Sequence, residues 1–158
     1  MANTYRGYSG VGGEIDVIVA SAGQSGGANP IQVGDSVHIS SGEAIAAGTI
    51  ADQGTAAQNM AQAAATFLGI AMALNSDGSV VTVATKGKFV LTQQAAGAAN
   101  VGDRVSVYAS ASACSDQEWA ATTTTNEIIG TVVKDITSTT DTSLIVEIFP
   151  ALFGPQAL

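Results

Sequence analysis

The chain repeats one short pattern in its two halves, and this repeat constrains the fold more than any other feature. Residues 33–39, with the sequence VGDSVHI, recur as residues 101–107, with the sequence VGDRVSV. Each copy places a Gly-Asp turn before a run in which every second residue is apolar, which is typical of a strand with one buried face. The repeat therefore predicts one architecture built from two similar halves.

Later segments recur in the same order. Residues 67–72 (FLGIAM) match residues 128–133 (IIGTVV), and residues 80–84 (VVTVA) match residues 144–148 (LIVEI). One segment departs from the strand pattern, because residues 55–65 are rich in alanine and Thr55 stands where it would cap a first helical turn. The predicted fold is mainly β, a small β-barrel or β-sandwich with two pseudo-duplicated halves and one short helix. The sequence does not distinguish a barrel from a sandwich.

The chain divides into three parts by composition. Residues 1–13 are rich in glycine and predict a flexible N-terminal arm, because ordering glycine costs much backbone entropy. Residues 14–149 form a single β-rich domain. Residues 150–158 form a C-terminal tail whose prolines exclude a helix, and whose apolar burial alone does not offset the entropy of ordering it. The tail therefore needs a groove on its own domain or on a neighbouring subunit. The expected strands are 15–19, 36–40, 43–50, 67–74, 80–85, 87–92, 104–109, 128–134 and 144–149.

Charge and cysteine content exclude several function classes. The net charge is −8, and the five Lys and Arg residues are scattered along the chain, which argues against direct nucleic-acid binding. Only 11% of residues are charged, against about 25% in a typical soluble domain, so much of the surface is expected to lie against other protein. No signal peptide is predicted, and the most apolar stretch, residues 63–74, is too short to cross a membrane. Cys114 is the single cysteine, and we expect it to be a reduced structural thiol.

The residues that resemble catalytic or binding groups have simpler structural explanations. Ser25 lies in a G-x-S-x-G pattern, but Asn29-Pro30 and a new strand follow where a nucleophile elbow requires a helix. The only histidine, His38, is expected on the polar face of a strand. Asp35 and Asp103 read as turn-forming residues. Trp119 reads as a packing anchor, with a sugar-stacking platform as the alternative. The sequence thus predicts a non-enzymatic protein without a metal ion or other cofactor.

The order of these motifs resembles the capsid cement or decoration protein family of tailed phages. The resemblance covers residues 30–150 and rests on the two Val-Gly-Asp segments and the strands that follow each of them. It implies a structural virion protein on the outer surface of the capsid. It also implies homotrimers over local three-fold positions, where they bridge subunits of the major capsid protein. The glycine-rich front and the Pro-Phe tail depart from the family pattern.

The glycine-rich N-terminal segment and the C-terminal tail are the segments expected to contact the capsid or a neighbouring subunit. We expect them to reach across subunits and to become ordered on binding. The candidate capsid or inter-subunit contacts are Tyr5, Tyr8, Phe149, Leu152, Phe153 and Leu158. The main alternative is a β-rich receptor or carbohydrate-binding module of a tail fibre or surface appendage, for which the threonine-rich loops and Trp119 argue. A small hydrolase that uses Ser25 as its nucleophile is the third hypothesis.

Overall fold

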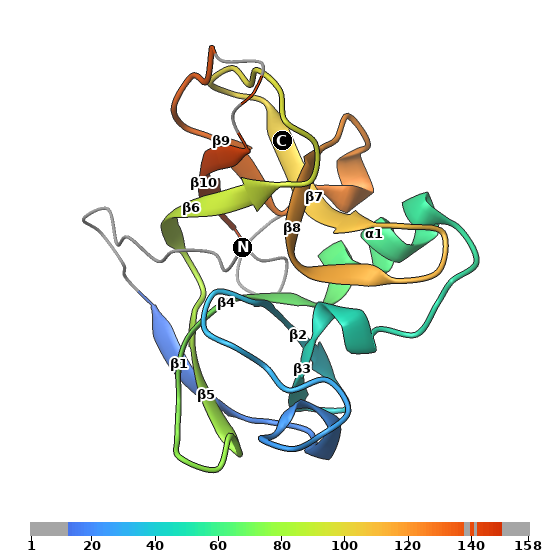
Figure 1. The fold of residues 1–158 in the computed structure, drawn as a ribbon, viewed down its shortest axis with the longest axis vertical. Helices are drawn as coiled ribbons and strands as arrows, with labels where there is room; N and C mark the ends of the chain where they lie inside the picture. Colours follow the sequence, from blue (N-terminus) through green and yellow to red (C-terminus); the bar gives the residue numbers. More distant parts are fainter. Residues whose placement is uncertain (1–12, 138–139, 141, 150–158) are drawn as a thin grey trace.

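The computed structural model describes residues 13–137, 140 and 142–149, which form a closed β-barrel and a second five-stranded sheet. The fold is mainly β with a single α-helix among the described residues, as predicted. Figure 1 shows the barrel in the upper half of the molecule, the other sheet in the lower half and the helix at one side. The lower sheet has the order β1 (Glu14–Ile18), β5 (Val80–Ala84), β4 (Phe67–Leu74), β2 (Ser36–Ser40) and β3 (Glu43–Ala46). The barrel has the order β10 (Ser143–Ile148), β6 (Gly87–Gln93), β8 (Cys114–Ala121), β7 (Arg104–Ala109) and β9 (Gly130–Val132).

The two sheets share one strand order. When β1 to β5 are matched in sequence with β6 to β10, the order β1-β5-β4-β2-β3 becomes β6-β10-β9-β7-β8, which is the order of the barrel. The end strands of each half also meet in parallel, through Gln93 and Trp119 in the barrel and through Val19 and Ala44 in the lower half. This correspondence is consistent with the duplicated halves that the repeated motif predicts.

The two Gly-Asp turns have the same geometry. The Asp35 carboxylate accepts a hydrogen bond from the backbone N–H of Gln32 at 2.7 Å, and the Asp103 carboxylate accepts one from the N–H of Asn100 at 2.8 Å. The glycine before each aspartate has a positive φ, of 95° and 97°, which glycine adopts without strain. Both aspartates are therefore turn-forming residues, as predicted.

The helix and several strands lie where the sequence places them. Helix α1 spans Ala56–Thr66, and the Thr55 hydroxyl accepts a hydrogen bond from the N–H of Gln58 at 3.2 Å, which confirms the predicted cap. The expected strand over 43–50 ends at Ala46, because residues 47–49 form a 3-10 helix. Strand β8 was not predicted. Its sequence, CSDQEWAA, lacks regular alternation, and it is held instead by pairing with β7 and β6.

The barrel and the lower sheet share a hydrophobic core. Trp119 of β8 is fully buried, and its ring contacts Phe67 of β4 edge-on, with ring centroids 5.9 Å apart and planes at 84°. Phe67, Ile70 and Ala84 from the lower half belong to the same cluster as the barrel core. A second cluster fills the lower half alone, between its strands and the segment that follows β1. The two halves thus pack as one body.

A polar contact joins the halves beside this core. The Gln117 side chain donates to the Asp35 carboxylate at 2.6 Å, and the Ser36 hydroxyl donates to the Asp116 carbonyl oxygen at 3.1 Å. The Asp116 carboxylate also accepts from the N–H of Gly48 at 2.7 Å. Burial raises the pKa of Asp35, and the hydrogen bonds from Gln32 and Gln117 oppose this effect. The start of β8 is therefore fixed to the lower half by hydrogen bonds with Asp35, Ser36 and Gly48.

The prediction that His38 lies on a polar face was wrong. The imidazole is fully buried between Phe67 and α1, with Nδ1 3.1 Å from the carbonyl oxygen of Ala63 and 3.2 Å from the Thr66 hydroxyl. Helix α1 packs over this face of β2, so both faces of the strand are interior here. Burial lowers the pKa of His38 to about 3, and the imidazole is neutral at physiological pH.

Acid should therefore destabilise the protein through His38. The unfolded chain binds a proton at this imidazole below its usual pKa of 6.5 and the folded protein does not, so unfolding is favoured by about 1.4 kcal/mol per pH unit in this range. The stability is complete above that pKa and is lost as the pH falls toward about 3. Denaturant unfolding of wild-type protein and His38→Gln between pH 7 and 4.5 should show a smaller pH slope for the variant. Equal slopes would contradict the assignment. Asp35, which acts in the opposite direction, is present in both proteins.

Candidate capsid-contact surface

Phe149 is the one predicted contact residue that the structure describes. It directly follows β10, its backbone N–H donates to the carbonyl oxygen of Ile129 at 3.0 Å, and its side chain is 40% exposed. Its backbone is therefore held against the barrel, and its side chain is partly exposed. The other predicted contacts lie outside the described residues: Tyr5, Tyr8, Leu152, Phe153 and Leu158.

Among the residues that the structure describes, three further large apolar side chains are exposed, and the sequence analysis named none of them as a contact. They are Ile18, Val33 and Val101, with exposed fractions of 64%, 44% and 60%. Val33 and Val101 occupy the same position in the two repeated turns. The turns require the glycine and the aspartate, but their hydrogen bonds do not involve the valine side chain. The repeated valine is the sequence signal that could have identified these two residues.

A surface hollow lies beside each of the two turns. The hollow at the second turn has a volume of about 530 Å³ and includes Arg104, and the hollow at the first turn has a volume of about 370 Å³ and includes Asp35. The larger is lined by Gly102, Asp103, Arg104, Ala121, Thr122 and Thr123. The smaller is lined by Asn29, Pro30, Gln32, Asp35, Ser115, Asp116 and Gln117. Each exposed valine thus belongs to a turn that borders a surface hollow.

The residues that a hydrolase would use, Ser25, His38 and Asp35, are not arranged for catalysis. Ser25 lies in a loop, where its N–H donates to the carbonyl oxygen of Asp77 at 3.3 Å, and β2 is the next regular element after it. His38 is sealed in the core and bonded to the helix, so it is inaccessible as a general base. Asp35 bonds to Gln117. The structure does not bring these three side chains into a nucleophile–base–acid array.

Trp119 and Cys114 are core residues. The burial of Trp119 leaves no aromatic face on which a sugar could stack, so packing is its role. Cys114 is buried, and burial together with the nearby Asp116 carboxylate raises the pKa of its thiol to about 11. Its Sγ lies 3.5 Å from the carbonyl oxygen of Asn59. Cys114 is therefore an unreactive thiol, in agreement with the structural role expected for it.

Across residues 13–137, 140 and 142–149, His, Cys, Asp and Glu side chains do not gather in groups of three or more that could hold a metal ion. Within the same ranges, no helix has the length and apolar character required to cross a membrane.

Comparison with known proteins identifies the family. A family model described as phage cement protein matches residues 31–148. The chain belongs to the phage cement protein family. The match runs from the segment before the first repeated turn to the end of β10, so it includes both valine turns and strands β2 to β10 of this cement protein. A search of curated proteins found no match to the chain. Family membership gives the protein a capsid-associated structural role.

Proposed function

We propose that this cement protein decorates the outer surface of a tailed-phage head as homotrimers at local three-fold positions. There it bridges neighbouring subunits of the major capsid protein and acts without catalysis. The family match supports the capsid association. The observation that carries the bridging role is the duplicated display of an exposed valine on two turns of the same geometry. A protein with two similar contacts suits a partner that is itself present as adjacent identical copies.

Several weak contacts are enough for such a role. Once one contact forms, the next becomes intramolecular and its effective concentration rises, so the joint affinity exceeds that of each contact. A trimer multiplies this effect. Packaged DNA exerts internal pressure on a phage head, and this pressure stresses the boundaries between subunits. A bridging protein adds contact area across these boundaries.

The composition of purified particles tests the proposal. Trimers at every local three-fold position give about one copy of this chain per major capsid subunit, which quantitative mass spectrometry of intact phage would measure. A few copies per particle would indicate a tail or fibre component instead. Absence from the particle would overturn the proposal.

The terminal segments give a further prediction. Deleting residues 1–13, or residues 150–158, should weaken binding to undecorated heads because the candidate contacts Tyr5, Tyr8, Leu152, Phe153 and Leu158 are removed. Circular dichroism should show that the β-domain remains folded in both deletions. A pelleting assay with heads measures binding, and Phe149→Ala in the full chain tests the remaining candidate. Undiminished binding by both deletions would refute the role of the ends.

A further inference from the structure

The lower half resembles the barrel but is less completely sealed. Val19 pairs in parallel with Ala44, as Gln93 pairs with Trp119 in the barrel, so Val19 is equivalent to Gln93. Counting back along each strand, Ile15 and Val17 of β1 are then equivalent to Phe89 and Leu91 of β6. Phe89 and Leu91 are almost fully buried in the shared core, which also contains Phe67, Ile70 and Ala84 of the other half. Ile15 and Val17 are only partly buried. The core of the lower half is therefore open along β1, where the barrel core is covered.

One edge of β1 has free backbone groups. Within the described part of the chain, β1 pairs with β5 on one side and meets β3 through a single bridge at Val19. The N–H of Val19 donates to Ser79 and the carbonyl of Gly13 accepts from Thr85, so the odd-numbered residues of β1 bond to β5. Because hydrogen-bonding direction alternates along an antiparallel strand, the N–H and C=O groups of the even-numbered residues point to the other edge. These residues are Glu14, Asp16 and Ile18. The edge meets β3 directly after Ile18, where the N–H of Ala20 donates to the carbonyl oxygen of Ala44 at 3.0 Å, so its unpaired stretch is at Glu14 and Asp16.

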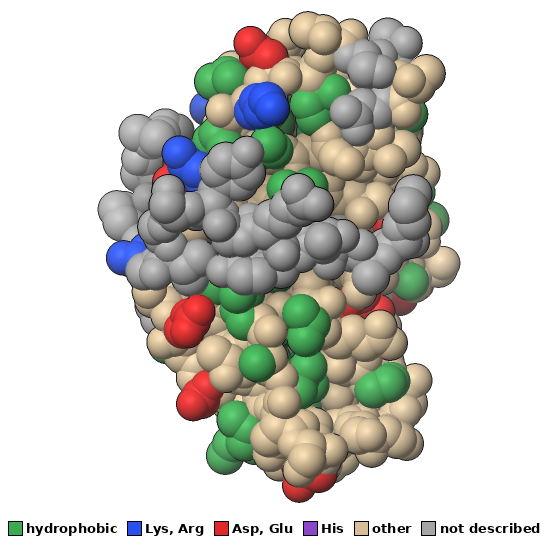
Figure 2. Space-filling view, turned by 60° about the vertical axis from the view of Figure 1, so that its left-hand side comes forward, with side chains coloured by type: hydrophobic (Ala, Val, Ile, Leu, Met, Phe, Trp, Pro, Cys, Tyr) green, Lys and Arg blue, Asp and Glu red, His purple; other side chains and the backbone are tan. Residues whose placement is uncertain are grey.

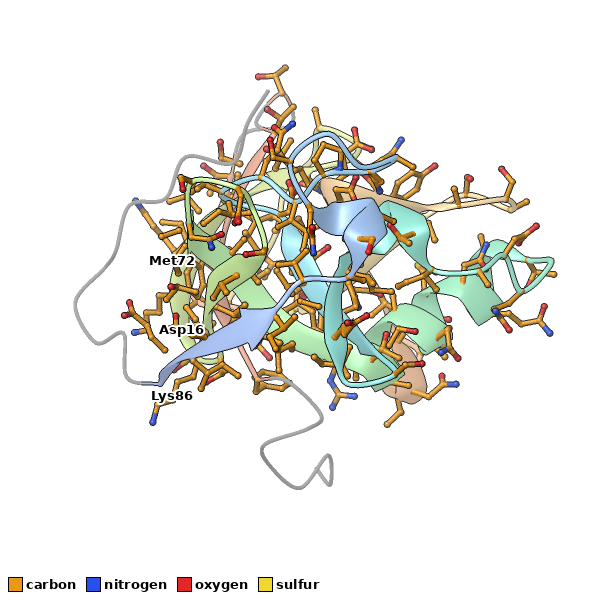
Figure 3. The ribbon with its side chains drawn as sticks, turned by 90° about the horizontal axis from the view of Figure 1, so that it is seen from below. Asp16, Met72 and Lys86 are labelled. Atoms are coloured by element: carbon orange, nitrogen blue, oxygen red, sulfur yellow. The ribbon has the colours of Figure 1, made fainter. Side chains whose placement is uncertain are left out.

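The side chains at this edge define what it can bind. Glu14 and Asp16 are exposed acids, and Ile18 is exposed and apolar. Residues 7–85 contain no Lys or Arg, and the side chain of Lys86 passes beside Gly13, next to Glu14, so one cation faces two acids here. Figure 2 looks toward this flank and shows no blue side chain in the lowest part of the molecule. Figure 3 shows Asp16 on the same flank as Met72 of β4 and Lys86, the first cation after the lower half. The edge therefore favours an extended segment with basic residues opposite the two acids and an apolar residue opposite Ile18.

We infer that the free edge of β1 binds an extended, basic segment of the major capsid protein, which adds to the lower sheet as a sixth strand. Main-chain hydrogen bonds supply the affinity, and the acids and Ile18 supply the selectivity. The added strand would cover the half-buried core residues beside β1. This inference rests on the proposed function, because it names the capsid protein as the partner, and it specifies which surface makes the contact.

A proline substitution tests the main-chain part of the inference. Asp16→Pro removes the N–H that faces the free edge, whereas Asp16→Ala keeps it, and both lose the hydrogen bond from Thr82 to the Asp16 carboxylate. We expect Asp16→Pro to bind undecorated heads about tenfold more weakly than Asp16→Ala, with both variants folded by circular dichroism. Equal binding by the two variants would overturn the inference.

Charge reversal tests the edge without changing the backbone, and it decides the matter if Asp16→Pro fails to fold. Glu14→Lys should reduce head binding several-fold, and Glu147→Lys, an exposed acid on β10 in the other half, should not. Equal effects of these two variants would count against the inference. A photo-crosslinking residue at position 18 should join the chain to the major capsid protein on decorated heads. Crosslinking only to another copy of this chain would also overturn it. If the wild-type protein itself does not bind heads, the proposed function fails instead.

Discussion

Trp119→Ala should cost about 3–5 kcal/mol of folding free energy, among the largest effects of any single truncation in this protein. The indole is fully buried in the core shared by both halves, edge-on to Phe67, and it lies on β8, which closes the barrel against β6. Its loss leaves a cavity at the place where the two halves meet. Urea unfolding followed by circular dichroism measures the change, since the variant has no tryptophan left for fluorescence.

Trp119→Phe is the matched control. Phenylalanine keeps an aromatic ring for Phe67, and no hydrogen bond is lost, because Nε1 of Trp119 has no partner in the described part of the protein. This variant should retain most of the stability that Trp119→Ala loses. Similar losses in the two variants would show that the indole is not the anchor of the shared core.

Gly69→Ala should be at least as damaging, for a different reason. Gly69 faces Val37 across the β2–β4 pair at a φ of 155°, and a Cβ there would overlap the carbonyl oxygen of Ala84 on β5. The overlap is with backbone, so no rotamer change relieves it, and strands β4 and β5 must separate. We expect a loss of about 3 kcal/mol or more, or failure to fold, measured by thermal and urea unfolding.

Gly26→Ala separates backbone strain from steric overlap. Gly26 also has a positive φ, of 84°, but nothing lies within 4 Å of a Cβ built there. Its cost should be limited to about 1–2 kcal/mol from the left-handed conformation. Gly130, the counterpart of Gly69 in the barrel, should give an intermediate loss when changed to alanine, because a Cβ would lie 2.6 Å from a methyl group of Val146 and 2.9 Å from the carbonyl oxygen of Glu147, a milder overlap with backbone than at Gly69. A Gly69→Ala protein as stable as Gly26→Ala would refute the steric explanation.

Local signals in the sequence were sufficient for much of the fold. Alternation located β2 and β7, the alanine-rich run located α1, and the Gly-Asp pairs located two turns of the same geometry. These elements depend on residues that are close together in the chain. The order of the strands, and the barrel closed by β6 and β8, depend on pairing between distant segments, which no local pattern encodes.

The same limit explains what was missed. The face of β2 that carries His38 is covered by α1, an element far along the chain, so alternation alone could not show that both faces are buried. Strand β8 lacks regular alternation of apolar residues and forms because two neighbours pair with it. In the candidate contact surface, the exposure of Ile18, Val33 and Val101 depends on what the rest of the chain leaves uncovered. Only the repetition of the valine was visible in the sequence.

The shared core has a mechanical consequence. Two domains joined by a linker would swing apart under tension and let their attachment points separate at little cost. Here Phe67, Ile70 and Ala84 of the lower half pack in the same cluster as Trp119 of the barrel, and the Asp35–Gln117 hydrogen bond joins the halves beside it. Tension applied between the halves must break this packing before the ends can separate. The protein is therefore stiff under tension, and the distance between attachment points on its two halves changes little until the shared core unfolds.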